Sequence, residues 1–226
     1  MTDSALRELA DDPSSRKRFF KMLGGAGAVS AATVFLAACG GDDEEKPPAA
    51  AAVKNENTSD LEVLNYALTL EFLEAEFYDK VIESGLVKDQ MVADLAKKFG
   101  ETEQEHVDAL TATIKKLGGT PVKAPKTKFE ETLAKGLEET LNTAATVENL
   151  GAAAYLGQAG NIKNKEVLAA ALAIHTVEAR HAAALNRLVG RGFKGDGDLS
   201  GSIPNGAFAK PMDMAAVNEA VKPFLA

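Results

Sequence analysis

Two short motifs in the chain pair a glutamate with a histidine three residues later. One is Glu103-x-x-His106 and the other is Glu178-x-x-His181. Three residues advance an α-helix by nearly one turn, so each glutamate and its histidine would project from the same face. Carboxylate and imidazole groups are together suited to bind Fe(II) or Mn(II). A single motif of this kind is usually a surface pair, but two of them at matched positions favour a metal site.

The two motifs belong to a longer internal repeat. Glu71 precedes Tyr78 by seven residues, and Glu148 precedes Tyr155 by seven. The second of these pairs lies 77 residues after the first, and the second Glu-x-x-His motif lies 75 residues after its counterpart. A pseudo-two-fold axis between two hairpins would gather four carboxylates and two imidazoles at one depth. Because burying an unpaired carboxylate is costly, we expect these groups to be paired, protonated or bound to metal.

Four amphipathic segments are predicted to position these residues. Hydrophobic periodicity places the helices at about residues 60–84, 88–117, 128–157 and 164–189. Short links make the first two and the last two antiparallel hairpins. The connection at residues 118–127 contains two prolines and can carry the chain back along the bundle as a crossover.

The fold class predicted from these segments is all-α, a four-helix bundle of two antiparallel hairpins joined by a crossover, over residues 60–190. Residues 191–226 form an irregular tail whose last piece, Met214 to Phe224, is weakly helical. We expect this tail to pack on the outside of the bundle.

Composition supports a helical bundle and excludes several classes of protein. The chain has 226 residues, of which 46% are hydrophobic and 6% aromatic, and this favours packed helices around one core. A net charge of −8, without a basic stripe, argues against nucleic acid as a partner. Cys39 is the only cysteine, which excludes an internal disulfide and a cysteine-ligated cluster.

Residues 1–38 are predicted to be a signal peptide. The stretch 22–38 carries no charge, and it is too short and too weakly apolar for a typical spanning helix. The basic run before it resembles a twin-arginine export signal with a lysine in place of the second arginine, over Arg16, Lys17, Arg18 and Phe19. A general secretory signal also begins with a basic segment, so both export routes stay open.

The signal ends in a sequence that predicts lipidation. Leu36-Ala37-Ala38-Cys39 resembles the lipobox of bacterial lipoproteins, in which the cysteine is acylated and becomes the mature N-terminus. The lipidated cysteine and a polar, Pro- and Ala-rich linker would occupy residues 39–59. The alternative is an uncleaved anchor helix. Either arrangement predicts a membrane-tethered protein of the bacterial cell envelope that faces the periplasm or the cell exterior.

The run LNYALTLEFLEAEFY at residues 64–78, together with the repeated motifs, resembles the ferritin-like superfamily of di-iron carboxylate proteins. It looks most like the exported members grouped with desiccation-related proteins, over about residues 60–190. The resemblance implies a ferritin-like four-helix bundle that binds two Fe or two Mn ions. It also implies roles for six residues: Glu71 and Glu148 as single-metal ligands, Glu103 and Glu178 as bridges, and His106 and His181 as one cap for each metal.

Four other polar residues lie near these stripes. Tyr78 and Tyr155 could form hydrogen bonds with the ligands from a second shell, or could simply fill the core. Glu74 lies one turn from Glu71 and could flank the site, substitute for that ligand or pair on the surface. His175 could be a third imidazole near the site, although a satisfied histidine is the commoner case.

The ligand set leaves several functions open. The first is a redox centre that oxidises Fe(II) or reacts with peroxide or dioxygen in stress protection. The second is a non-catalytic structural or binding bundle associated with stress, and the third is a manganese catalase-like enzyme. The single cysteine argues against a rubredoxin-type electron-transfer module. A lipid tether suits a monomer or homodimer better than a storage cage.

Overall fold

The computed structural model describes residues 59–192, 201–202 and 208–226. The chain divides into two units, Met1–Ala49 and Ala50–Ala226, and all the described residues belong to the second. The expected signal peptide, the lipidation site Cys39 and nearly all of the linker therefore lie outside the described residues. In the part that is described, none of the helices combines the length and the apolar character needed to cross a membrane.

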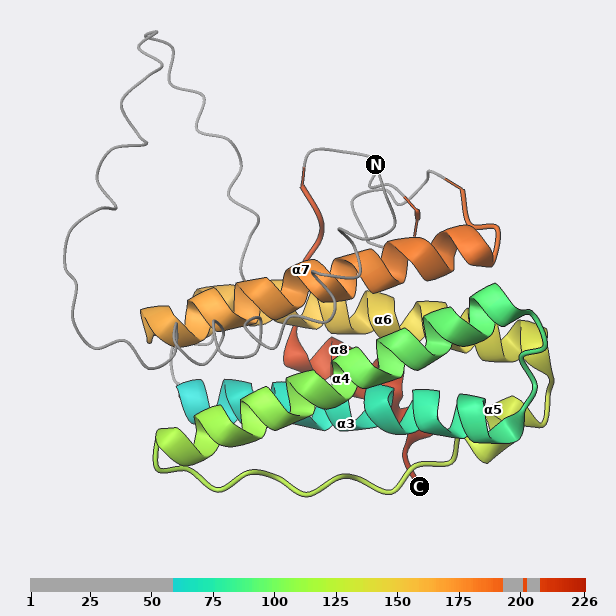
Figure 1. Cartoon of the computed structure of the whole chain (residues 1–226). Helices are drawn as coiled ribbons and strands as arrows, with labels where there is room; N and C mark the ends of the chain where they lie inside the picture. The colour runs from blue at the N-terminus through green and yellow to red at the C-terminus, as the bar shows by residue number, and fades with distance from the viewer. Residues whose placement is uncertain (1–58, 193–200, 203–207) are drawn as a thin grey trace, which may run out of the picture. The chain divides into compact units, whose positions relative to one another are not determined.

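Helices α3 and α4 form the first antiparallel hairpin (Figure 1). Helix α3 spans Asp60–Ser84 and begins with a capping box, in which Ser59 and Glu62 each accept a backbone hydrogen bond from the other. Helix α4 spans Gln90–Lys116, and the side chain of Asp89 caps its first turn. These caps satisfy backbone donors that would otherwise lack partners, so both helix starts are well defined.

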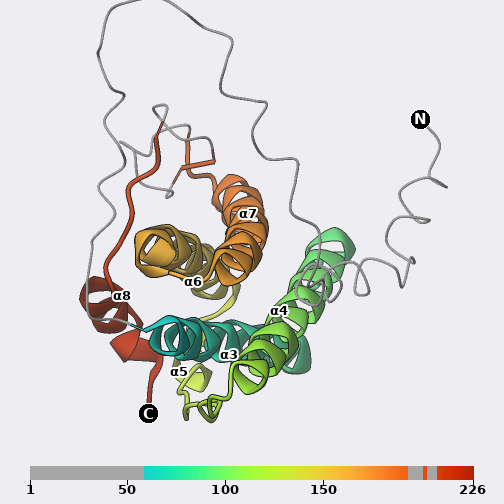
Figure 2. The ribbon, with the colours of Figure 1, turned by 90° about the vertical axis from the view of Figure 1, so that its left-hand side faces the viewer.

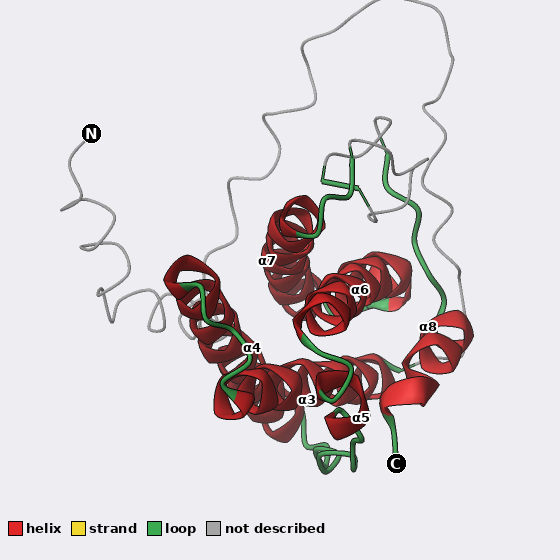
Figure 3. Cartoon of the chain, turned by 90° about the vertical axis from the view of Figure 1, so that its right-hand side faces the viewer, coloured by secondary structure: helices red, strands yellow, loops and turns green. Residues whose placement is uncertain are grey.

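The prediction of a single helix over residues 128–157 is wrong at the N-terminal end of this segment. Helix α5 covers Glu130–Leu133 and a separate helix α6 covers Leu137–Gln158. Between them Gly136 has φ 97°, a conformation that glycine adopts without steric cost and that interrupts a helix. The chain therefore turns at this glycine, and α5 lies beside α3 (Figure 3).

Helices α6 and α7 form the second antiparallel hairpin (Figure 2). A 3-10 turn at Ala159–Asn161 follows α6, and α7 spans Lys165–Leu188. The side chain of Asn164 caps the start of α7. The carboxylate of Asp60 accepts hydrogen bonds from the backbone of Lys163 at 2.7 Å and of Asn164 at 2.8 Å. This loop of the second hairpin is thereby held to the first turn of α3.

The connection between α4 and α5 runs back along α3 (Figure 1). Near its beginning, the backbone of Val122 donates to Asn65 Oδ1 at 2.8 Å. Near its end, the hydroxyl of Thr127 donates to Glu76 Oε1 at 2.8 Å. Since Asn65 and Glu76 are about three turns apart on α3, this segment is the crossover that the sequence predicted. The predicted all-α bundle of two antiparallel hairpins joined by a crossover is confirmed.

The C-terminal segment packs on the bundle. Helix α8, Met214–Val221, lies beside α6, and a 3-10 turn, Lys222–Phe224, follows it (Figure 2). Val217 of α8 is fully buried in the core. Beyond the turn, Leu225 pairs with Thr127 in an isolated antiparallel bridge, so the segment also holds the crossover.

Apolar residues form two clusters, and the polar motifs lie between them. On α4, Phe99 belongs to one cluster and Leu110 to the other. On α7, Leu185 and Ile174 are divided in the same way. Each Glu-x-x-His motif lies between the two apolar residues of its own helix. The bundle therefore encloses a polar centre between two apolar layers.

Candidate metal centre

Six polar side chains from the four long helices meet in the interior of the bundle. They are Glu71 from α3, Glu103 and His106 from α4, Glu148 from α6, and Glu178 and His181 from α7. The glutamates are 0% exposed and the histidines 8% and 6% exposed. The structure thus brings together all six residues that the sequence singled out as metal ligands; we refer to them as the six-residue centre.

One half of the centre surrounds His106. Its Nδ1 atom lies 3.1 Å from Glu71 Oε2, 2.9 Å from Glu103 Oε2 and 3.1 Å from Glu178 Oε1. A ring nitrogen carries at most one hydrogen, so it cannot serve three carboxylates at once. Three oxygens and one nitrogen therefore converge on a small space that suits a cation.

The other half surrounds His181. Its Nδ1 atom lies 2.7 Å from Glu103 Oε1 and 3.3 Å from Glu148 Oε2. Glu178 completes this group, and the potential ligand atoms of each half all lie within 4.8 Å of one another. Glu103 directs one oxygen towards each histidine, and Glu178 belongs to both halves. The two halves consequently share two carboxylates.

Several buried atoms of the centre have no hydrogen bond. They are Glu103 Oε1, Glu148 Oε2, both oxygens of Glu178 and His181 Nδ1. Glu103 Oε1 and His181 Nδ1 are close enough for an ion pair, but their geometry is not that of a hydrogen bond. Buried charged atoms without partners are costly. Cations bound among these atoms would remove this cost.

Burial and mutual repulsion give the centre a high affinity for protons. Burial raises the pKa of three of its glutamates, that of Glu178 well above the ordinary value. Burial acts in the same direction on Glu103, but the nearby imidazoles of His106 and His181 hold its pKa down at about 2. Burial lowers the pKa values of both histidines, but the facing carboxylates raise them by more. The net result is a raised pKa for each, about 9 for His181. Metal ions would replace these protons.

The donor set fits two divalent cations. Four carboxylates balance the charge of two such ions, and each half supplies one imidazole nitrogen with carboxylate oxygens. Mixed oxygen and nitrogen ligation suits Fe(II) or Mn(II) better than soft metals. The residues present are therefore compatible with a metal-binding bundle.

Two tyrosines hold Glu71 and Glu148 across the hairpin interface. Tyr78 on α3 donates to Glu148 Oε1 on α6 at 2.5 Å, and Tyr155 on α6 donates to Glu71 Oε1 on α3 at 2.5 Å. Both rings are buried. Each bond turns the other oxygen of its glutamate towards a histidine. The hydroxyls thus lie where a second shell of hydrogen bonds would orient metal ligands.

Phe99 is a neighbour of the centre that sequence reasoning did not single out. Its ring stacks on the imidazole of His181, with centroids 3.8 Å apart and an interplanar angle of 24°. It lies four residues before Glu103 on the same helix, and this spacing is the signal that could have identified it. The stacked ring limits the orientations open to His181.

Glu74 is a fifth buried carboxylate beside the centre. It is 3% exposed, and its Oε2 atom has no hydrogen bond. Burial raises its pKa well above the ordinary value, and repulsion from Glu178 and Glu71 adds to the rise. Of the roles that the sequence left open, surface pairing is therefore excluded.

Gly151 makes room for Glu74. A Cβ atom at this position would lie 2.6 Å from Glu74 Oε1 and 2.9 Å from Glu178 Oε2. Gly151 follows Glu74 by 77 residues, the same interval that relates Glu71 to Glu148. Sequence reasoning missed this glycine, although the repeat could have shown it. One hairpin thus places a carboxylate in the space left by a missing side chain on the other.

His175 does not join the centre. It is only half-buried, and its Nδ1 atom contacts the backbone carbonyl oxygen of Ala152 at 3.0 Å. Burial lowers the pKa of His175, whereas the histidines of the centre have raised pKa values. The commoner alternative, a satisfied histidine, describes it better than a third imidazole at the site.

The bundle and its paired acid-and-histidine motifs define a class of helical protein with a carboxylate-rich centre between two hairpins. Within that class, the family described as Ferritin-like domain matches residues 59–191, which is more than half of the chain. The chain therefore belongs to the ferritin-like domain family. No curated protein matches the chain.

Proposed function

We propose that the six-residue centre binds two Fe or two Mn ions and carries out redox chemistry with dioxygen or peroxide. The observation that supports this most directly is the single Nδ1 atom of His106, which faces three carboxylate oxygens at 3.1 Å or less. In the second half, His181 lies with Glu103, Glu148 and Glu178, and their potential ligand atoms all lie within 4.8 Å of one another. Buried carboxylates that repel one another in both halves of the centre are costly unless cations bind among them.

In this proposal Glu71 and His106 hold one metal, and Glu148 and His181 hold the other. Glu103 and Glu178 serve both. A bound pair of Fe(II) ions would supply two electrons to the oxidant. With two protons, dioxygen would be reduced to hydrogen peroxide, or hydrogen peroxide to two water molecules.

The chain's own residues would orient the ligands and exclude water. Tyr78 and Tyr155 fix one oxygen each of Glu148 and Glu71, so that the other oxygen of each glutamate would be free to bind a metal ion. Phe99 covers one face of His181. Complete burial of the glutamates keeps bulk water away, and electrostatic interactions are stronger in such an environment.

We further propose that the domain works at the bacterial cell envelope, tethered through a lipid on Cys39 and exported by a twin-arginine or general secretory route. The lipobox-like sequence before Cys39 supports the tether. A role in stress protection, and a closeness to desiccation-related proteins, belong to the same proposal. Metabolic labelling with a fatty acid analogue tests the anchor: label should enter the wild-type chain and be lost in Cys39→Ala.

Metal content is the decisive test of the centre. We expect about two equivalents of iron or manganese in the purified chain by inductively coupled plasma mass spectrometry, and none in a Glu103→Ala/His181→Ala variant. A Glu101→Ala/His175→Ala variant is the matched control, because it removes one exposed glutamate of α4 and a histidine of α7 outside the centre. Absence of metal from helical wild-type protein would contradict the redox proposal and favour a structural bundle.

A further inference from the structure

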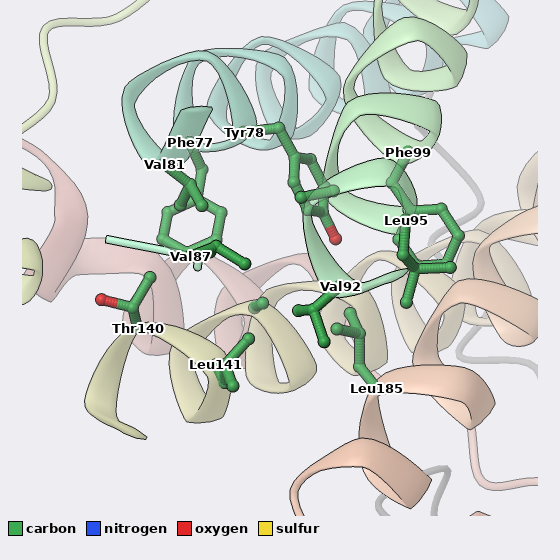
Figure 4. Close-up of a pocket in the computed structure, with 12 residues that line it drawn as sticks. Phe77, Tyr78, Val81, Val87, Val92, Leu95, Phe99, Thr140, Leu141 and Leu185 are labelled. Atoms are coloured by element: carbon green, nitrogen blue, oxygen red, sulfur yellow. The ribbon is translucent and has the colours of Figure 1, made fainter. Parts of the chain in front are cut away.

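An apolar cavity lies one helical turn from the six-residue centre, at the end of the bundle where α3 leads into α4 (Figure 4). Ala144 lines it four residues before Glu148. In the same way, Leu185 lines it four residues after His181. Each interval corresponds to a rise of about 6 Å along its helix. The cavity therefore approaches the centre from two helices of the second hairpin.

The inner wall of the cavity is in direct contact with the centre. Phe99 lines the cavity and stacks on His181. Tyr78 lines it as well and donates its hydroxyl hydrogen to Glu148. Two aromatic rings thus separate the cavity from one histidine and one glutamate of the His181 half.

The outer wall consists of half-buried apolar residues. Val87 comes from the loop between α3 and α4, Val92 and Leu95 from the first turns of α4, and Leu141 from the first turns of α6 (Figure 4). The inner residues Phe77, Phe99 and Leu185 are buried. An apolar path therefore leads from the partly exposed end of the bundle to the rings beside the centre.

The lining selects against polar molecules. Of its residues, Thr140 and Tyr78 carry side-chain hydroxyls, and both hydroxyl hydrogens are already donated, that of Thr140 to the carbonyl of Gly136 at 2.9 Å. Water or hydrogen peroxide in a cavity needs several hydrogen-bond partners. The volume of about 10 Å³ leaves space for one small molecule. A small apolar molecule such as a diatomic gas suits this space best.

We propose that this cavity admits dioxygen to the six-residue centre, and that Phe99 and Tyr78 are the last side chains it passes. The inference rests on the proposed redox function and narrows its oxidant to dioxygen. A polar oxidant would gain no hydrogen bonds along this path and would have to lose its hydration. Dioxygen has no such cost.

Xenon tests the cavity independently of metal, because it fills small apolar spaces. We expect the metal-free full chain to give a saturable xenon-129 chemical shift. Val92→Trp should abolish it by filling the rim, while Val122→Trp, a matched change in the crossover outside the cavity, should retain it. A second variant, Leu141→Ala, enlarges the space and should strengthen xenon binding.

The same variants then separate the two oxidants in the iron-loaded chain. We expect Val92→Trp to keep its metal content but to slow oxidation by dioxygen roughly tenfold, a change equal to 1.4 kcal/mol in barrier height. Oxidation by hydrogen peroxide should stay unchanged, and Leu141→Ala should speed the reaction with dioxygen. Normal metal content without xenon binding, or equal slowing with both oxidants, would overturn this inference alone. Absence of metal from the wild-type chain would overturn the proposed function and this inference with it.

Discussion

The first hairpin, α3 and α4, and the second hairpin, α6 and α7, supply matching functional groups to the centre, yet the residues around those groups differ. Each provides two glutamates, one histidine and one tyrosine at repeated spacings. Where the first has Glu74, the second has Gly151. Repetition therefore builds the centre, and this departure from the repeat places an extra carboxylate on one side of it.

The difference between Glu74 and Gly151 has a physical consequence for the two halves of the centre. Glu74 occupies space beside Glu178 that a side chain at Gly151 would fill. The repulsion that Glu178 exerts is the largest charge effect that raises the pKa of Glu74. The two halves of the centre thus have matching ligands but different surroundings. Variants of the ligands test the match, and variants of Glu74 and Gly151 test the difference.

The largest effect should follow the loss of a shared ligand. Glu103→Gln removes a carboxylate that faces both histidines, so both metal equivalents should be lost. Glu71→Gln removes a ligand of one half, and only about half of the metal should be lost. Metal analysis after dialysis measures both. Equal losses in the two variants would show that the halves do not share ligands.

A side chain at Gly151 should damage the centre through crowding. We expect Gly151→Ala to lower the free energy of unfolding of the metal-free chain by about 1–3 kcal/mol, since its Cβ atom would lie too close to two carboxylates. Combined Glu74→Ala and Gly151→Ala should recover part of this loss, and denaturant unfolding measures the coupling. Gly192→Ala is the control because no atom of the described residues lies within 4 Å of its Cβ position. Simple additivity would contradict the proposed contact.

The two tyrosines should behave alike. Tyr78→Phe and Tyr155→Phe each remove a hydrogen bond to a single-metal glutamate, and each should weaken metal binding about tenfold. Competition with a chelator of known affinity gives the comparison. Tyr66→Phe should leave metal affinity unchanged, because the Tyr66 hydroxyl is buried without a hydrogen-bond partner. A loss in only one of the first two variants would show that the metal positions differ in more than Glu74.

The smallest effect concerns pH. The raised pKa of His181 favours the folded state below pH 6.5, and this contribution is lost as pH rises towards about 9. The raised pKa of Glu74 acts in the same direction, because its carboxylate must lose a proton inside the bundle at high pH. The metal-free chain should therefore melt about 2–4 °C lower at the upper end of this range. Glu74→Gln should flatten the dependence in calorimetric scans, and an unchanged slope would show that Glu74 does not contribute.

Hydrophobic periodicity predicted the helices, and the spacing of the motifs predicted that the six residues would meet. Both predictions were possible because each pattern can be recognised within one helix at a time. Ser59 and Asp89 cap helices at positions that local rules recognise. The break at Gly136 was missed, because a lone glycine within a helical pattern does not reveal a positive φ. Its conformation depends on how α5 packs against α3.

The repeat and the helical spacing could point to residues such as Gly151 and Phe99, but not to the atoms that these residues contact on the other hairpin. The space at Gly151, the stacking of Phe99 on His181 and the apolar cavity all depend on how closely different helices approach. Spacing also left the role of His175 undecided, because its contact with the Ala152 carbonyl is set by the neighbouring helix. Side-chain periodicity identifies the face that a residue occupies, but not the atom it meets there.

The reciprocal bonds of Tyr78 and Tyr155 have a consequence for the lifetime of the protein. Docking of the hairpins forms these bonds but also takes five carboxylates out of water, and without metal this second effect favours opening. The metal-free chain should then open more often and become more sensitive to proteases. Metal supply would thus determine how long each copy survives.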